Sequence, residues 1–330
     1  MKVLVVDSFS SPHTVDNTQG LLKAYSKVAI AKPFDYRRGG PVHMNARLIE
    51  TAMAFQPDLL HLGKAEKVTG ATVKEIKRRL PNTYVIYFYC DYRPKLQQFV
   101  IDIGRYADCT LFNAADERVL GKYHEAGVKH VGGWWSVGTD PEIFYPRKVK
   151  RAWDLLFMAH NQRLPHKGYP KRRQLVAAIL DAGFDLHLFG TGWGYLKERK
   201  NAHLHPFAGG EKFADACSRA KITLGINGVN DVRMCASWRR AFNSMASGAF
   251  HLTHYIPGLE TFFEDKKHLV WFHSVPEAIE LIKYYLPHEI EREKIATAGR
   301  QIVLADHIWD KRIEVMMDRW RQWHEEGNRE

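Results

Sequence analysis

The sequence has no apolar run long enough to cross a bilayer. Its longest apolar stretches, such as residues 84–90, have the length of a β-strand, whereas a membrane-spanning helix needs about 20 apolar residues. The first residues form a strand-like apolar run and lack the pattern of a secretory signal peptide. We therefore expect neither a membrane span nor export.

Cysteine is also scarce. The chain has four, Cys90, Cys109, Cys217 and Cys235, which are widely spaced and form no Cys-x-x-Cys pair. This pattern argues against a zinc ribbon and against a disulfide scaffold, and it suits a reducing compartment. We interpret each cysteine as a small buried hydrophobic residue rather than a nucleophile, and we expect a cytoplasmic protein.

Several catalytic motifs are absent. The sequence contains no HExxH, no GxSxG and no phosphate-binding P-loop, which disfavours metalloproteases, serine hydrolases and P-loop NTPases. It has no internal repeat and no low-complexity segment. No set of metal ligands is predicted.

Positive charge, by contrast, is in excess. The formal net charge is +11, from 48 Lys and Arg against 37 Asp and Glu, and both halves of the chain contribute. The densest stretch, residues 147–173, holds nine basic residues and a single acidic one, Asp154. Such a field attracts polyanions such as nucleic acid, nucleotide phosphates or acidic polymers. A solvated basic surface is the alternative interpretation.

Strand-like and helix-like segments alternate along the chain in two series, which is typical of α/β domains with a mostly parallel sheet. The predicted strands are residues 2–7, 59–62, 84–89 and 109–112 in the first series, and 154–158, 185–189, 222–226 and 250–253 in the second.

The segment 132–146 is rich in Gly and Pro and interrupts this alternation, so we interpret it as a linker. We expect two Rossmann-like domains, residues 1–145 and 146–306, followed by a last helix within 307–330. Open parallel sheets bind ligands outside the carboxyl ends of their strands. Two facing sheets would therefore surround one cleft.

Two loops of the second domain are candidates for binding an anion. The first, which contains Gly190, Gly192 and Trp193, directly follows a strand. Its glycines would let backbone N–H groups approach a phosphate or base, and Trp193 would wall off a ring; a plain tight turn is the alternative. The second begins at Asn227 and leads through Arg233 to a helix whose N-terminus would also attract an anion.

Two loops of the first domain carry candidate catalytic residues. Asp91 comes directly after an apolar strand and would act as a general base or hold an acceptor hydroxyl group. His13 lies in the loop after the first strand and is a second candidate. A helix cap for Asp91 and a structural role for His13 are the alternatives.

Segments scattered over residues 130–315 match a known family pattern. They are DLLF at 154–157, FGTGW at 189–193, RAFNSMASG at 240–248, FHLT at 250–253, GLETFF at 258–263, IATAG at 295–299, His307, and GTD at 138–140 followed by Phe144 and Pro146. Together they resemble the GT-B glycosyltransferases, specifically the CgeB-like (spore-maturation-protein-like) group.

The resemblance implies two Rossmann-like domains around a cleft and a C-terminal helix that crosses back to the first domain. It implies a nucleotide-sugar donor, a UDP-sugar, held by the second domain, with no cofactor and no bound metal. On this pattern Arg240 and Arg233 face the donor diphosphate, Asn243 the ribose, and the Gly190–Trp193 turn the base. Asn243 stands where the family usually has Glu, and an amide still hydrogen-bonds a hydroxyl group without being a charged acceptor.

The expected function is therefore transfer of a sugar from a nucleotide-sugar to a hydroxyl acceptor, which Asp91 or His13 would orient. The positive charge favours a polyanionic acceptor such as a modified base in DNA, as for phage enzymes of this fold, which would work in the host cytoplasm. A surface polysaccharide, a protein or a small molecule remains open as acceptor. Two further hypotheses are a non-catalytic nucleic-acid-binding protein on the same scaffold and a sugar-nucleotide epimerase.

Overall fold

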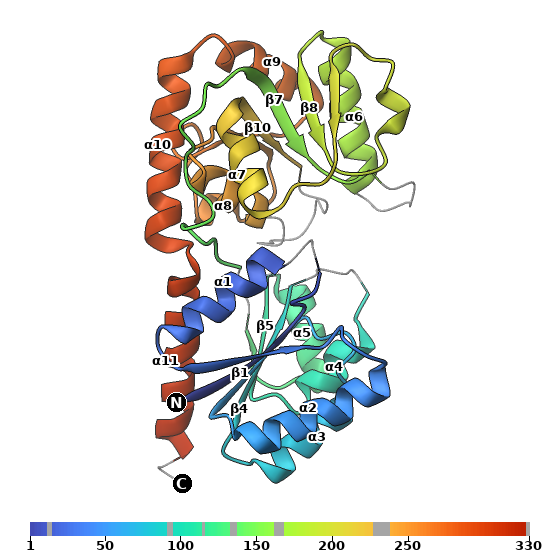
Figure 1. Cartoon of the computed structure of the whole chain (residues 1–330), viewed down its shortest axis with the longest axis vertical. Helices are drawn as coiled ribbons and strands as arrows, with labels where there is room; N and C mark the ends of the chain where they lie inside the picture. Colours follow the sequence, from blue (N-terminus) through green and yellow to red (C-terminus); the bar gives the residue numbers. More distant parts are fainter. Residues whose placement is uncertain are drawn as a thin grey trace. The chain divides into compact units, whose positions relative to one another are not determined.

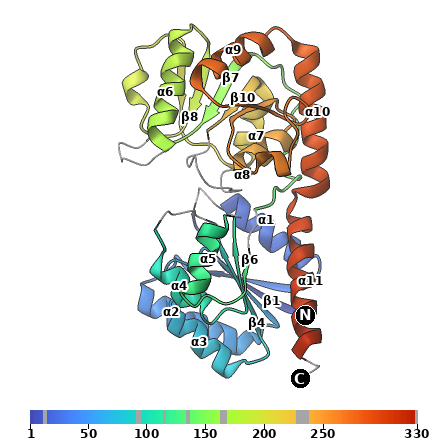
Figure 2. The same ribbon diagram turned by 180° about the vertical axis from the view of Figure 1, so that it is seen from behind.

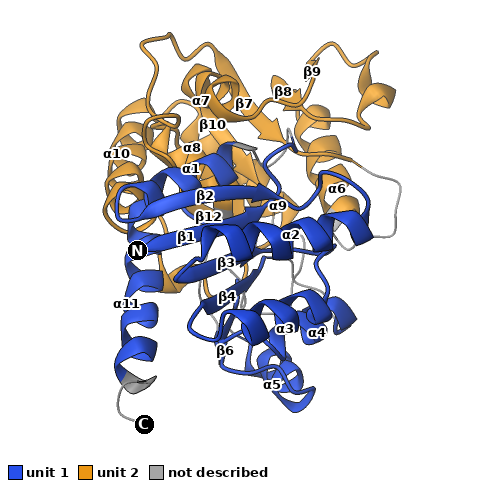
Figure 3. Cartoon of the chain, turned by 60° about the horizontal axis from the view of Figure 1, so that its bottom comes forward, with its two compact units in different colours: residues 1–138, 233–236, 309–330 blue, residues 139–232, 237–308 orange. Residues whose placement is uncertain are grey.

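The computed structural model of the chain describes residues 1–11, 15–90, 95–113, 116–132, 137–161, 168–226 and 238–327. These residues form two compact units (Figure 3). Unit 1 contains the residues up to Gly138 and those from Trp309 onward, whereas unit 2 contains described residues between Thr139 and Ile308.

Unit 1 is built on a parallel sheet (Figure 1), in which the strand order is β2-β1-β3-β4-β5-β6. Its strands are β1 (Lys2–Asp7), β2 (Ile30–Asp35), β3 (Leu59–Gly63), β4 (Tyr84–Tyr89), β5 (Cys109–Phe112) and β6 (Val131–Gly132). The central strands are buried on both faces, which explains their nearly unbroken apolar sequences.

Alternate residues of these strands pack on opposite faces of the sheet. Leu4 and Val6 belong to the core beneath the helices α2 to α5, and Val3 and Val5 belong to the core beneath α1 and α11. Figures 1 and 2 show this division of the helices within the unit. The helices are α1 (Val15–Ser26), α2 (Pro41–Phe55), α3 (Gly70–Arg79), α4 (Gln98–Gly104), α5 (Glu117–Glu125) and α11 (Trp309–Gly327).

Unit 2 repeats the design with the strand order β12-β11-β10-β7-β8-β9, again parallel. Its strands are β7 (Trp153–Met158), β8 (Leu186–Phe189), β9 (Ala202–His205), β10 (Ala220–Gly225), β11 (His251–His254) and β12 (Val270–Phe272). Its helices are α6 (Gly168–Asp181), α7 (Gly210–Arg219), α8 (Trp238–Ala246), α9 (Val275–Tyr285) and α10 (Glu289–Asp306), with short 3₁₀ turns η1 (Gly194–Leu196) and η2 (Leu259–Thr261).

Local sequence signals set several helix ends. Thr69, Asp116 and Ser274 accept a hydrogen bond from a backbone N–H in the first turn of α3, α5 and α9, respectively. Such side-chain caps satisfy N–H groups that have no partner within the helix. Pro41 begins α2, where a missing N–H costs nothing.

The C-terminal helix α11 packs in unit 1 although it directly follows unit 2 in sequence (Figure 2). Trp309, Ile313 and Met316 of this helix are buried in the core that also contains β1, and Asp310 forms a 2.7 Å ion pair with Lys27, the residue directly after α1. The expected fold class, two α/β domains on parallel sheets with a last helix that returns to the first, is confirmed.

Candidate functional site

The carboxyl edge of the unit 2 sheet has a switch point between β7 and β10. These strands are neighbours, and the chain continues from β7 to β8 and β9 on one side and from β10 to β11 and β12 on the other. Open α/β sheets bind ligands outside such a point, because the loops there diverge. The helices that follow the two strands, α6 and α8, begin at this edge.

Two predicted donor-binding residues, Gly190 and Gly192, lie in the loop after β8 and hold it against the loop after β7. We call residues 159–161 and 190–192 together the paired loops. Gly190 has a φ of 127° and Gly192 one of 85°, both in the region that favours glycine. A Cβ atom on Gly192 would lie 1.8 Å from the carbonyl oxygen of Asn161, so this close approach requires glycine.

Hydrogen bonds fix the paired loops to each other. The backbone N–H of Asn161 donates to the carbonyl oxygen of Thr191 at 2.8 Å, and its side-chain amide donates to that of Gly192 at 3.0 Å. The Nδ1 atom of His160 lies 2.9 Å from the Thr191 hydroxyl oxygen. The His160 ring in turn stacks on Phe207, with 5.4 Å between the ring centroids. The paired loops therefore form one hydrogen-bonded surface at the carboxyl edge.

Trp193 was predicted to cover one side of a bound ring. It instead lies in the core of unit 2, with 2% of its surface exposed. Its indole N–H donates to the carbonyl oxygen of Ala159 at 2.6 Å. A buried ring with a satisfied donor has no face left for a ligand. Trp193 instead supports the paired loops from within the core.

Arg240 lies in the first turn of α8, and its side chain is half-buried. Among the residues that the structure describes, its guanidinium group has no hydrogen bond or ion pair. Burial, and then the positive charges of Arg172 and Arg239, lower its pKa to about 9, so it still carries its charge at neutral pH. These mutually repelling cations favour an anion among them.

Arg172 is a member of this group that was not assigned to the site from the sequence. It lies near the start of α6, where its guanidinium group donates to the carbonyl oxygen of His160 at 2.9 Å. Its Nε atom is buried and has no hydrogen-bond partner within the described part of the chain. Its neighbour Arg173 donates to the side chain of Asn161 at 3.0 Å. The sequence feature that could have identified Arg172 is the run of three basic residues at 171–173, in the first part of the helix that follows β7.

Asn243, predicted to face a ribose, is 5% exposed. Its side-chain oxygen accepts a hydrogen bond from the Thr139 hydroxyl group at 2.7 Å. The backbone N–H of Thr139 donates to the carbonyl oxygen of His307 at 2.9 Å. The side-chain oxygen of Asn243 is thus already bonded within unit 2. Its NH₂ group is the part of the amide that can donate to a hydroxyl group of a ligand.

A buried chain of polar side chains links α8 to the strands β10 and β11. The Thr223 hydroxyl oxygen lies 2.6 Å from that of Ser244 and 3.0 Å from Nδ1 of His251. Burial, and then the Arg240 charge, lower the pKa of His251 to about 3. His251 is therefore neutral at physiological pH and adds no positive charge beside the Arg240 guanidinium group.

We predict that His251 makes the protein less stable in mild acid. Below about pH 6.5 the unfolded chain protonates this imidazole, whereas the folded chain does not until about pH 3. The free energy of unfolding should fall by about 1.4 kcal/mol per pH unit across this window on account of His251. Urea unfolding between pH 7 and pH 5 should show a shallower loss for His251→Asn than for the wild type, with the exposed His124→Ala as control. Parallel pH profiles for His251→Asn and the wild type would contradict this assignment.

The other predicted site residues lie outside the described residues, as do the aromatic residues considered for stacking on an acceptor. The predicted site residues are His13, Asp91, Asn227 and Arg233; the aromatic residues are Tyr92, Trp134 and Trp135.

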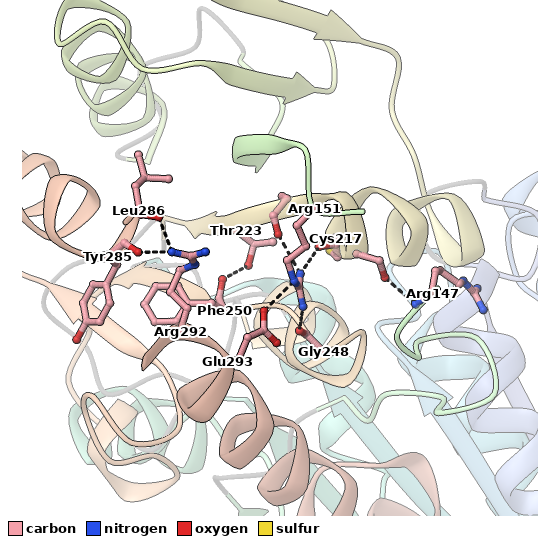
Figure 4. Close-up of polar contacts among 12 residues, drawn as sticks. Arg147, Arg151, Cys217, Thr223, Gly248, Phe250, Tyr285, Leu286, Arg292 and Glu293 are labelled. Atoms are coloured by element: carbon pink, nitrogen blue, oxygen red, sulfur yellow. Dashed lines mark hydrogen bonds and ion pairs between the residues drawn. The ribbon is translucent and has the colours of Figure 1, made fainter. Parts of the chain in front are cut away.

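The basic stretch 147–173 makes many of its contacts within unit 2. The Arg151 guanidinium group donates to the carbonyl oxygens of Ala220 at 3.0 Å and Gly248 at 2.5 Å, and it pairs with Glu293 at 2.9 Å (Figure 4). Arg147 donates its backbone N–H to the side chain of Ser218. Arg151 of this stretch is thus engaged in contacts within unit 2. Fewer positive charges are therefore accessible to a polyanion than the count of basic residues suggests.

One group of potential metal ligands is present in the described residues, although the sequence pattern predicted none. Asp185, His187 and His203 place one ligand atom each within 4.8 Å of the others. Asp185 directly precedes β8, His187 lies in β8, and His203 lies in β9. The sequence signal for this group was aspartate and histidine at alternate positions in and next to these strands, and β9 was not predicted.

Within the described residues, no helix combines the length and the apolar character that a bilayer crossing requires. No curated protein matches the sequence. Residues 171–318 match the family described as "Glycosyl transferase-like". This match begins near the start of α6 and includes Arg172, Gly190, Gly192, Arg240 and Asn243.

Solved structures extend the likeness to the whole chain. A sucrose-phosphate synthase from Thermosynechococcus elongatus superposes with a TM-score of 0.70 at 13% identity, over 98% of this chain and 99% of that chain. The chain has the GT-B fold. HepE of Anabaena, solved in complex with UDP and glucose, has a TM-score of 0.69 at 14% identity, over 96% of this chain and 99% of that one. A glycosyltransferase from Rickettsia africae has a TM-score of 0.67 at 11% identity, over 97% and 98%.

Proposed function

We propose that the chain is a glycosyltransferase of the CgeB-like group, which moves a sugar from a UDP-sugar to a hydroxyl group of an acceptor. The observation that carries this proposal is the Arg240 guanidinium group, which lies near Arg172 and Arg239 and has no anionic partner among the described residues. All three arginines fall within the part of the chain that matches the glycosyl transferase-like family. The complexes of HepE with UDP and with UDP-glucose support a uridine nucleotide.

In the proposed reaction the acceptor oxygen forms a bond to the anomeric carbon of the sugar while the bond from that carbon to the diphosphate breaks. The bonding electron pair leaves with UDP, so negative charge grows on the diphosphate. Arg240 and Arg172, joined by Arg233, would stabilise this charge more in the transition state than in the bound donor. Fixed guanidinium groups would thereby replace a metal ion, which makes the transfer metal-independent in this proposal.

The rest of the donor would contact the paired loops and α8. Backbone groups of Gly190 and Gly192 would hold the base, with Trp193 keeping the loop in place from the core. The free NH₂ group of Asn243 would donate to a ribose hydroxyl group, since its oxygen is bonded to Thr139. Asn227 would complete the donor contacts from the loop after β10.

We assign the acceptor to unit 1, where Asp91 or His13 would take the hydroxyl proton. The net charge of +11 favours a polyanionic acceptor. DNA that carries a hydroxymethylated base is the first such acceptor to test, because it combines a phosphate backbone with a primary hydroxyl group that a sugar can join.

The donor test measures thermal unfolding with UDP, UDP-glucose, other UDP-sugars and GDP-sugars. A ligand at 100 times its Kd stabilises the folded state by about 2.7 kcal/mol, so a UDP-sugar should raise the Tm clearly and GDP-sugars should not. Release of UDP on addition of an acceptor would then establish transfer. If neither UDP nor any nucleotide-sugar changes the Tm, the proposal fails.

The acceptor test incubates the protein and a UDP-sugar with hydroxymethylated DNA, unmodified DNA and small hydroxylated molecules, and analyses the products by mass spectrometry. A hexose added to the hydroxymethylated DNA alone would support a DNA acceptor. A binding assay on plain duplex DNA at low salt identifies a non-catalytic DNA-binding protein, because such a protein would bind without stabilisation by any donor. No DNA binding at low salt would exclude DNA and leave a polysaccharide, protein or small acceptor.

A further inference from the structure

An alternating pattern on the edge of unit 2 brings three potential metal ligands to one face of the sheet. Asp185 directly precedes β8, His187 lies within it, and His203 lies in the edge strand β9, paired with His187 in the parallel register. Leu186 and Leu188, between and beside these residues, belong to the hydrophobic core on the opposite face. Strand alternation therefore separates the polar group from the core.

The ligand atoms are close enough to share one ion. The Nε2 atom of His203 lies 2.5 Å from Oδ1 of Asp185, and the Nε2 atom of His187 lies 3.5 Å from Oδ2 of the same carboxylate. Zinc binds imidazole nitrogen and carboxylate oxygen at about 2.0–2.2 Å, so ligand atoms around it lie roughly 3.3 Å apart. All three atoms already lie within 4.8 Å of one another. To share one ion, the imidazole rings of His187 and His203, which stack with 4.5 Å between their centroids, must turn toward the Asp185 carboxylate.

A second layer of contacts orients the central ligand. Nδ1 of His187 lies 3.0 Å from Nε2 of His205, so the second nitrogen of the His187 ring is engaged and its Nε2 is left for a metal. The His187 ring also stacks on Trp153, with 3.9 Å between the ring centroids and 14° between the planes. In metal-binding histidines a hydrogen bond at the other ring nitrogen, most often to a carboxylate, a carbonyl oxygen or water, fixes the tautomer and the ring. Here the imidazole of His205 takes that place.

Solvent access differs among the three ligands in a way that suits ion entry. His187 is 8% exposed, whereas the side chains of Asp185 and His203 are 39% and 42% exposed. A bound ion would have one buried and two accessible protein ligands, with a remaining position for water. Asp185 lies at the amino end of β8, whereas the paired loops follow its carboxyl end, so the ion would take no part in sugar transfer.

We propose that Asp185, His187 and His203 bind one divalent transition-metal ion, Zn²⁺ in the first instance, which fastens the edge strand β9 to β8. Two imidazoles and one carboxylate are ligands that Zn²⁺ accepts, with the fourth position open. The strand β9 has β8 as its only neighbour in the sheet of the described residues, and it leads to Phe207, which stacks on His160 of the paired loops. The ion would thus stabilise unit 2 and order the segment that supports the paired loops.

The test uses the full chain, without a histidine tag and freed of metal by a chelator, in calorimetric titrations with Zn²⁺ and in absorption spectra with Co²⁺. We expect one Zn²⁺ per chain and a Co²⁺ spectrum typical of a site with nitrogen and oxygen ligands. Asp185→Asn, which preserves shape, and His203→Ala, which alters an accessible residue, should each weaken Zn²⁺ binding by more than about 10-fold. His124→Ala, an exposed histidine of unit 1, is the matched control and should bind as the wild type does.

Thermal unfolding gives a second readout that does not depend on activity. Zn²⁺ should raise the Tm of the wild type and of His124→Ala, and should leave the Tm of Asp185→Asn and His203→Ala unchanged. Absence of stoichiometric Zn²⁺ binding to the wild type would overturn the proposal. So would equal affinity of the wild type and both site variants, because Zn²⁺ would then bind elsewhere on the chain.

Discussion

Arg240→Ala should lower kcat/KM for sugar transfer roughly 100- to 1000-fold, the range found when one charge-stabilising donor is removed from an active site. The guanidinium group is half-buried near Arg172 and Arg239 and has no protein anion as partner in the described residues. Its loss therefore removes a positive charge that would stabilise the diphosphate. It leaves no carboxylate of the described residues without a partner, because none is paired with Arg240. Steady-state kinetics with a UDP-sugar measures the effect.

The control for this variant is Arg199→Ala, because Arg199 is a surface arginine of unit 2 paired with Asp181. Its kcat/KM should equal that of the wild type. Arg240→Lys should fall between the two, since a lysine keeps the charge and loses the paired N–H donors of a guanidinium group. Wild-type turnover by Arg240→Ala would remove the central residue of the proposed donor site.

Gly192→Ala should lower the free energy of unfolding of unit 2 by about 3 kcal/mol, a large effect for a single methyl group. The new Cβ would lie 1.8 Å from the carbonyl oxygen of Asn161, and the backbone φ of 85° is itself unfavourable for alanine. The paired loops must separate to admit the methyl group, so binding of UDP should weaken as well. Urea unfolding followed by circular dichroism measures the stability change.

Gly194→Ala is a close control, two residues along the same segment. Its added Cβ would meet no atom within 4 Å, and the residue lies in the 3₁₀ turn η1 without a positive φ. Its stability should stay within about 1 kcal/mol of the wild type, with a small gain from the stiffer unfolded chain. Equal losses in both variants would show that the contact with Asn161 is not what requires a glycine at position 192.

The sequence predicted the central strands of both sheets and missed the strands at their edges. The missed strands are β2, β6, β9 and β12, and each lies at one end of its sheet. An edge strand has one neighbour and is only partly covered, so it does not need a continuous apolar run. In β2, Pro33 is tolerated because the strand pairs with β1 alone among the described strands, and in β9 two of the four residues are histidine.

The candidate site was predictable where local sequence decides the geometry. Gly190 and Gly192 stood out because a glycine-rich loop after a strand marks a close approach of backbones, and such an approach is present. For Trp193 and Asn243, sequence could not tell a ligand contact from a packing contact, because this depends on the loop after β7 and on Thr139, both distant in the chain. Arg172 was missed because its proximity to Arg240, which is also distant in the chain, cannot be read from local sequence.

The position of α11 has a consequence for the order in which the chain can fold during synthesis. Unit 2 ends at Ile308, so all of its described strands and helices are available before Trp309 is added. Unit 1 begins first, but one face of its sheet is covered by α1 and α11 together, so it needs Trp309, Ile313 and Met316 to complete that cover. On the ribosome, where domains fold as their residues emerge, unit 1 is translated before unit 2 and yet is completed after it, and the apolar face beneath α1 stays only partly covered until α11 is made.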